Sequence, residues 1–95
     1  MSASVWRINP VSRLHWRHWE EEYIVFNEAS AHTHMLDEFG AVVLQLLQEA
    51  PRNTPQLVKA LVSQYDIKMD AACWSYFQNL LIDLDELGLI ESHHA

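Results

Sequence analysis

Histidines are the residues of this sequence best suited to hold a metal ion. His15, His18, His32 and His34 fall in its first 34 positions, and the last two are spaced to share one face of a strand. A metal site normally needs three or four converging ligands with supporting partners. No CxxC or HExxH motif occurs, and no carboxylate lies at a fixed offset from the His pair. We therefore expect no metal and no other cofactor, and interpret the histidines as surface or hydrogen-bonded strand residues.

Nucleophilic catalysis has little support in the sequence. Cys73 is the only cysteine and falls on a predicted apolar helix stripe, where a thiol behaves as a small hydrophobic group. No serine has the neighbouring glycines of a nucleophile elbow. The two glycines, Gly40 and Gly88, are too far apart for a phosphate-binding loop. The sequence predicts a protein that is not an enzyme.

Cellular location is predicted from what the sequence lacks. A lone cysteine indicates no disulfide framework, the N-terminus has no signal-peptide pattern, and no apolar run reaches the roughly eighteen residues of a membrane helix. We expect a cytoplasmic protein that is not bound to a membrane.

Charge is distributed unevenly along the chain. The net charge is −7, but residues 1–19 contain three arginines and no acid, a balance of +3. Residues 20–95 contain thirteen acids against Arg52, Lys59 and Lys68, a balance of −10. That part would repel a phosphate backbone, so we expect no nucleic-acid partner and favour basic or neutral ones.

Two kinds of periodicity meet near residue 37. Before it, residues 14–19, 23–27 and 32–36 are rich in aromatic and β-branched side chains and are separated by short polar gaps. They predict an antiparallel meander of three strands. After it, the apolar spacing is helical. The chain is therefore expected to be a single α+β domain, a small winged-helix-like fold with residues 1–11 and 92–95 peripheral and the tail frayed.

Three helices are predicted after the strands. Asp37 caps the first, which Pro51 stops; Thr54 and the following proline begin the second, which runs to about residue 65. The third runs from a cap at Asp70 to Leu87, with Gly88 at its C′ position.

The third predicted helix has more apolar surface than one core contact needs. Its core stripe is expected to contain Cys73, Phe77, Leu80, Leu84 and Leu87. On one flank stand Trp74 and Leu81, with Gln78 and Asp85 just beyond. Two interpretations remain open: strand side chains cover this flank, or Trp74 and Leu81 line a groove.

A three-helix arrangement of this kind also raises a DNA-binding hypothesis. Winged-helix proteins place a helix in the major groove and use Arg or Lys on bases and phosphates. The third helix instead offers Asp70, Asp83, Asp85 and Glu86 and no base. The helix therefore argues against DNA binding.

The chain resembles a known family in three stretches. These are residues 19–36 (WEEEYIVFNEASAHTHML), residues 37–47, and the closing LDELGLI of residues 84–90. Over residues 12–91 they resemble the PqqD-like peptide chaperones, in particular the group associated with HPr-kinase-related proteins. That group has a strand ending in Phe-Asn, a small-residue turn and a Thr-His pair, matched here by Phe26-Asn27, Ser30 and Thr33-His34. Ala31-His32 departs from the glycine and polar residue often found in the group.

The resemblance implies a RiPP recognition element, in which a three-stranded sheet packs on three helices. Such domains bind the leader of a precursor peptide as an added strand, between the third strand and the third helix. The implied partners are that leader and a modifying enzyme or kinase-like protein. Together with the helix flank described above, the expected peptide-binding residues are His32, Thr33, His34, Met35, Trp74, Gln78, Leu81 and Asp85. Asp85 and Glu86 would favour a peptide with Lys or Arg.

Two alternatives remain: a winged-helix transcription regulator, and a structural adaptor that docks on a kinase-like partner. The sequence makes no prediction of oligomeric state.

Overall fold

The structure is a computed structural model and describes residues 4–94. Its elements follow in the order β1(Ser4–Ile8), β2(Leu14–Trp19), β3(Glu22–Asn27), β4(His32–Leu36), α1(Glu38–Glu49), α2(Thr54–Tyr65), α3(Ala71–Glu86) and β5(Ile90–His94). Strands β2, β3 and β4 form an antiparallel sheet ahead of three helices, so the predicted α+β class is confirmed. No helix in residues 4–94 is long and apolar enough to cross a membrane.

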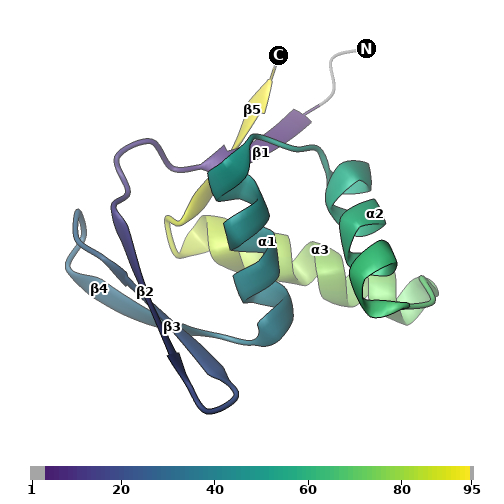
Figure 1. Ribbon diagram of the computed structural model, residues 1–95. Helices are drawn as coiled ribbons and strands as arrows, with labels where there is room; N and C mark the ends of the chain where they lie inside the picture. The colour runs from purple at the N-terminus through teal and green to yellow at the C-terminus, as the bar shows by residue number, and fades with distance from the viewer. Residues whose placement is uncertain (1–3, 95) are drawn as a thin grey trace.

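Cross-strand register decides which side chains of the three-stranded sheet face the helices. Trp16, Val25 and His34 are opposite one another in adjacent strands, and Val25 is fully buried. Because successive side chains alternate between the two faces, the neighbouring row through Met35 points outward. In Figure 1, α1 lies between this sheet and α2, and α3 crosses behind α1.

The turn between β3 and β4 is held by a buried asparagine. Asn27 is 4% exposed, and its Oδ1 accepts hydrogen bonds from the backbone N–H groups of Arg13 and Ala29. Its Nδ2 donates to Ser12 Oγ. At the end of the turn, Ala31 has a φ of 61°, which is the left-handed region that favours glycine. Glycine would adopt this backbone conformation at lower cost than Ala31 does.

Each helix begins at a capping side chain close to the predicted position. Asp37 and Asp70 each accept a hydrogen bond from the backbone N–H three residues on, and so cap α1 and α3. The second helix is capped by Asn53, one residue before the predicted Thr54, through a reciprocal pair with Gln56. These caps satisfy N–H groups that have no partner within the helix.

The core face of α3 differs from the predicted stripe. Phe77 and Leu84 are buried as expected. Leu81 is only 2% exposed, which agrees with the interpretation in which this flank is covered. Leu87 is 45% exposed although it was expected in the core. The helix also packs against β5. The face that the helix buries therefore includes Leu81 and not Leu87.

The two ends of the described chain pair with each other. Strands β1 and β5 form an antiparallel sheet in which Trp6 lies opposite Ser92. Trp6 and Arg52 also exchange two backbone hydrogen bonds. Residues 1–11 were expected to be peripheral and residues 92–95 frayed; Ser4–Ile8 and Ile90–His94 are instead strands, and residues 1–3 and 95 lie outside the described range.

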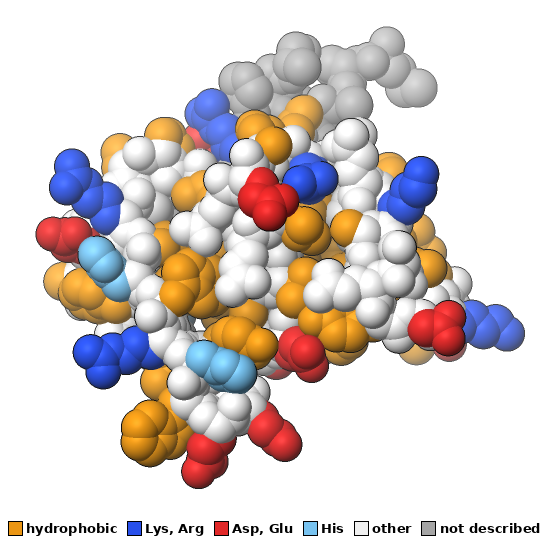
Figure 2. All heavy atoms as spheres, in the orientation of Figure 1, with side chains coloured by type: hydrophobic (Ala, Val, Ile, Leu, Met, Phe, Trp, Pro, Cys, Tyr) orange, Lys and Arg blue, Asp and Glu red, His pale blue; other side chains and the backbone are white. Residues whose placement is uncertain are grey.

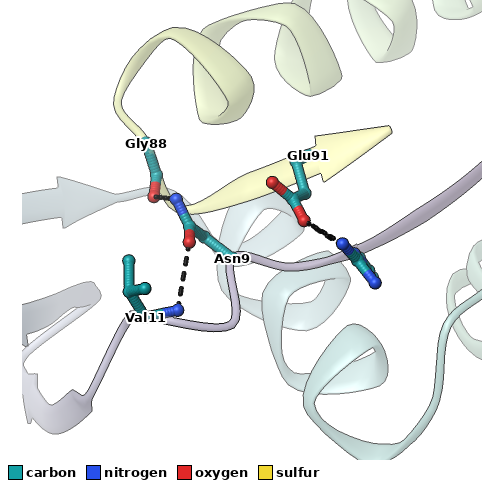
Figure 3. Close-up of polar contacts among 5 residues, drawn as sticks. Asn9, Val11, Gly88 and Glu91 are labelled. Carbon is teal, nitrogen blue, oxygen red and sulfur yellow. Dashed lines mark hydrogen bonds and ion pairs between the residues drawn. The ribbon is translucent and has the colours of Figure 1, made fainter. Parts of the chain in front are cut away.

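Figure 3 shows how this terminal sheet holds the C-terminal end of α3. The side-chain amide of Asn9 donates to the carbonyl oxygen of Gly88 at 3.2 Å, and its Oδ1 accepts from the backbone N–H of Val11. Arg7 donates through Nε to Glu91 at 2.7 Å. Gly88 has a φ of 77° and ends the helix in the conformation that the sequence predicted for it.

Candidate binding groove

β4 is an edge strand with nothing in its sequence to prevent pairing. The strand order is β2-β3-β4, so the main-chain groups along one side of β4 have no strand beside them in the described sheet. Proteins commonly protect such edges with proline or charged side chains. The segment His32–Leu36 (HTHML) contains no proline, lysine, arginine or acid. It is therefore open to a further strand.

A groove lies between the end of β4 and α3. It has a volume of about 240 Å³ and is lined by Met35, Leu36 and Asp37 on one side. On the other side it is lined by four residues of α3 and its C-terminal cap, which are Leu80, Asp83, Leu84 and Leu87. The spacing of these four places them on one helix face. The walls are apolar, with one carboxylate on each side.

Of the residues predicted from the sequence to bind peptide, only Met35 lines this groove. His32, Thr33 and Met35 are exposed on the edge strand. Trp74, at 37% exposure, Gln78 and Asp85 are exposed on α3, yet none of them lines the groove. The α3 residues predicted from the sequence and those that line the groove therefore lie on different flanks of this helix. Leu87 lies on the groove flank and is 45% exposed, so its apolar side chain is available for contact.

Asp37 connects β4, α1 and α3 at the end of the groove. Its Oδ1 accepts the backbone N–H of Gly40 at 2.7 Å, and its Oδ2 accepts a hydrogen bond from the hydroxyl of Tyr76. Burial, followed by this hydrogen bond, raises the pKa of Tyr76 to about 12. The hydroxyl thus remains a donor at neutral pH, and α3 is held at a fixed position beside β4.

His34 occupies an unusual environment on β4. Its side chain is partly buried, and its Nε2 has no hydrogen-bond partner among the described residues. Burial, followed by repulsion from His32, lowers the pKa of this imidazole. The two rings lie 6.2 Å apart, edge to face. Among residues 4–94, no three His, Cys, Asp or Glu side chains are grouped closely enough to hold a metal ion.

A larger hollow continues from the groove toward the β2–β3 hairpin. Its volume is about 880 Å³, and it is lined by residues 19–22 and 35–38. Met35, Leu36 and Asp37 line both the hollow and the groove. Figure 2 shows acidic side chains gathered at the hairpin tip, at the bottom of the view, beside hydrophobic ones. This hollow was not predicted from the sequence, in which Glu20-Glu21-Glu22 is visible only as a polar turn.

Comparison with known proteins identifies one family. A family model described as coenzyme PQQ synthesis protein D (PqqD) matches residues 22–90. No curated protein and no solved structure matches the chain significantly. The matched range includes β3, the edge strand β4, all three helices and the groove residues of α3. Because the match covers more than two thirds of the 95 residues, the chain belongs to the PqqD family.

Proposed function

We propose that this protein captures the leader of a ribosomally made precursor peptide by strand addition at β4 and presents it to a modifying enzyme. The PqqD family consists of non-catalytic, peptide-binding accessory proteins of RiPP biosynthesis. The observation that carries the proposal for this chain is the open edge of β4 beside an apolar groove. The partner that the resemblance implies is a modifying enzyme or a kinase-like protein.

In the proposed complex, main-chain hydrogen bonds supply affinity and side-chain contacts supply selectivity. An added strand forms main-chain hydrogen bonds with His32–Leu36, which supply affinity for any extended peptide. Alternate side chains of that strand face the groove. There they contact Leu80 and Leu87, which select apolar residues at those positions.

Strand addition can be tested with peptides selected on the full-length protein from a displayed library of random segments of about twelve residues. In an amide hydrogen-exchange experiment followed by NMR, alternate amides of His32–Leu36 should gain protection when a selected peptide binds. Methylation of single peptide nitrogens should weaken binding with a period of two residues, because every second N–H faces β4. Protection confined to β2 or to the β1–β5 sheet would contradict the proposal.

A second candidate, an adaptor that docks on a kinase-like protein, is favoured by one observation. Trp19, Phe26 and Met35 are 67%, 37% and 64% exposed. Register places Phe26 and Met35 on the outer face of the sheet, and exposed apolar side chains grouped in this way mark protein interfaces. If Phe26→Ser abolishes binding of the kinase-like protein but the wild type selects no peptide, the adaptor role holds alone.

A further inference from the structure

The groove and the hollow meet at the C-terminal end of β4, and the two together are called the channel. Met35, Leu36 and Asp37 line both of them, so a peptide strand that continues past Leu36 enters the hollow. The lining contains six carboxylates and no lysine or arginine, the carboxylates being those of Glu20, Glu21, Glu22, Asp37, Glu38 and Asp83. A channel whose walls carry charge of one sign favours an occupant of the opposite charge.

Partners within the chain account for only two of these carboxylates. Asp37 accepts hydrogen bonds from Gly40 and Tyr76, and Glu38 accepts one from Tyr65 at 3.2 Å. For the three hairpin glutamates and Asp83, the part of the chain that the structure describes supplies no salt bridge and no side-chain hydrogen bond. The salt bridges of that part join other acids, namely Glu91, Glu28 and Glu49.

Exposed apolar side chains stand beside these carboxylates. Trp19 is 67% exposed and Met35 64% exposed, and both line the hollow. Lysine and arginine have long aliphatic stems that cover apolar surface while their charged ends stay in water. Their cations are also attracted to the face of an indole ring. The hollow therefore matches both parts of a basic side chain.

We propose that the captured peptide is basic at the end that lies beyond Leu36, and apolar at the positions that contact Leu80 and Leu87. The proposal rests on the peptide-binding function proposed above and assigns the chemistry of the peptide. Binding is then directional, because one end of the channel is lined by most of the carboxylates and the other end by apolar residues of α3.

The random library provides the first test. Peptides that bind the full-length protein should be enriched in lysine and arginine relative to the input library, with the basic residues clustered at one end and apolar residues next to them. A paramagnetic label at the basic end should broaden the NMR signals of the β2–β3 hairpin more than those of the turn between β3 and β4. Selected peptides without basic enrichment, or broadening at the opposite end, would overturn the inference.

Two double variants with the same change in net charge provide the second test. Glu21→Gln/Asp83→Asn removes two charges from the channel. Asp66→Asn/Glu49→Gln removes two exposed acids outside it; Asp66 has a φ of 53°, which asparagine tolerates. The first variant should bind a selected basic peptide roughly threefold to tenfold more weakly, mostly through a slower on-rate, and with less dependence on salt. The second should bind within about twofold of wild type, since screened charges far from a ligand contribute little.

The outcomes separate the inference from the function on which it rests. If selected peptides protect β4 but both double variants behave alike, the charge assignment fails and strand addition stands. If no peptide is selected, or if none protects β4, the proposed function and the inference both fail.

Discussion

Replacing Ala31 with glycine should stabilise the fold. It has a φ of 61° at the end of the β3–β4 turn, a conformation that costs an L-residue roughly 1–2 kcal/mol and glycine little. Because glycine also loses more entropy on folding, we expect Ala31→Gly to raise the free energy of unfolding by about 0.5–1 kcal/mol, measured by urea denaturation. Ala29→Gly, at a neighbouring turn residue without a positive φ, should not stabilise; equal gains from both variants would exclude this explanation.

His34 should make stability depend on pH. Burial and the neighbouring His32 lower its pKa from 6.5, so the unfolded chain takes up a proton at a higher pH than the folded one. The contribution of His34 is therefore fully present above pH 6.5 and is lost as the pH falls through 6.5 to the lower folded-state pKa. Urea denaturation at pH 7.5 and 5.5 should show a smaller difference for His34→Gln than for the wild type. An NMR titration of the folded protein that places the pKa of His34 above 6.5 would reverse the expected sign.

Helix α3 has exposed apolar side chains on two flanks, and we expect only the flank that lines the groove to bind peptide. Leu87 lines the groove and is 45% exposed, whereas Trp74 is 37% exposed and lies outside the groove lining. We expect Leu87→Ser to weaken binding of a selected peptide by about tenfold, or roughly 1.4 kcal/mol, and to change stability little because Leu87 is not needed in the core. Trp74→Ser serves as the control and should leave the dissociation constant unchanged in a fluorescence-anisotropy titration. The opposite pattern would favour the Trp74 flank that was predicted from the sequence.

Loss of the β1–β5 sheet should strongly lower the free energy of unfolding. Trp6 packs against the core and donates through Nε1 to Thr54 Oγ1 at 3.1 Å. Trp6→Ala removes this packing and should lower the free energy of unfolding by about 3 kcal/mol or more, as measured in urea. A loss below 1 kcal/mol would show that β1 and β5 contribute little to the fold.

For the whole molecule, the charge balance predicts that duplex DNA is not a partner. Residues 20–95 carry a balance of −10, and no lysine or arginine follows Lys68. Non-specific DNA binding depends on neutralising phosphates with cations. We therefore expect no mobility shift of duplex DNA at about 150 mM salt. A sequence-dependent shift under those conditions would favour the transcription-regulator alternative.

Local sequence determined the succession of elements. Capping residues such as Asp37 and Asp70, the left-handed Gly88, and the change from alternating to helical apolar spacing act over a few residues, and the structure has the predicted elements within one or two positions. The absence of charge in His32–Leu36 was likewise visible as a property of one segment. These features can be predicted from the sequence because they arise from interactions between residues that are close together in the chain.

Only the tertiary structure decided which surfaces meet. Helical spacing shows that α3 has a wide apolar face, but which flank is buried depends on the packing of β5 and the sheet, and that packing placed Leu81 inside and Leu87 at the groove. Arg7 and Glu91 pair across 84 positions of the chain, and no local pattern records such a contact. The acidic channel likewise combines the hairpin glutamates with Asp37 and Asp83. The sequence specifies such sites only through the packing of the complete fold.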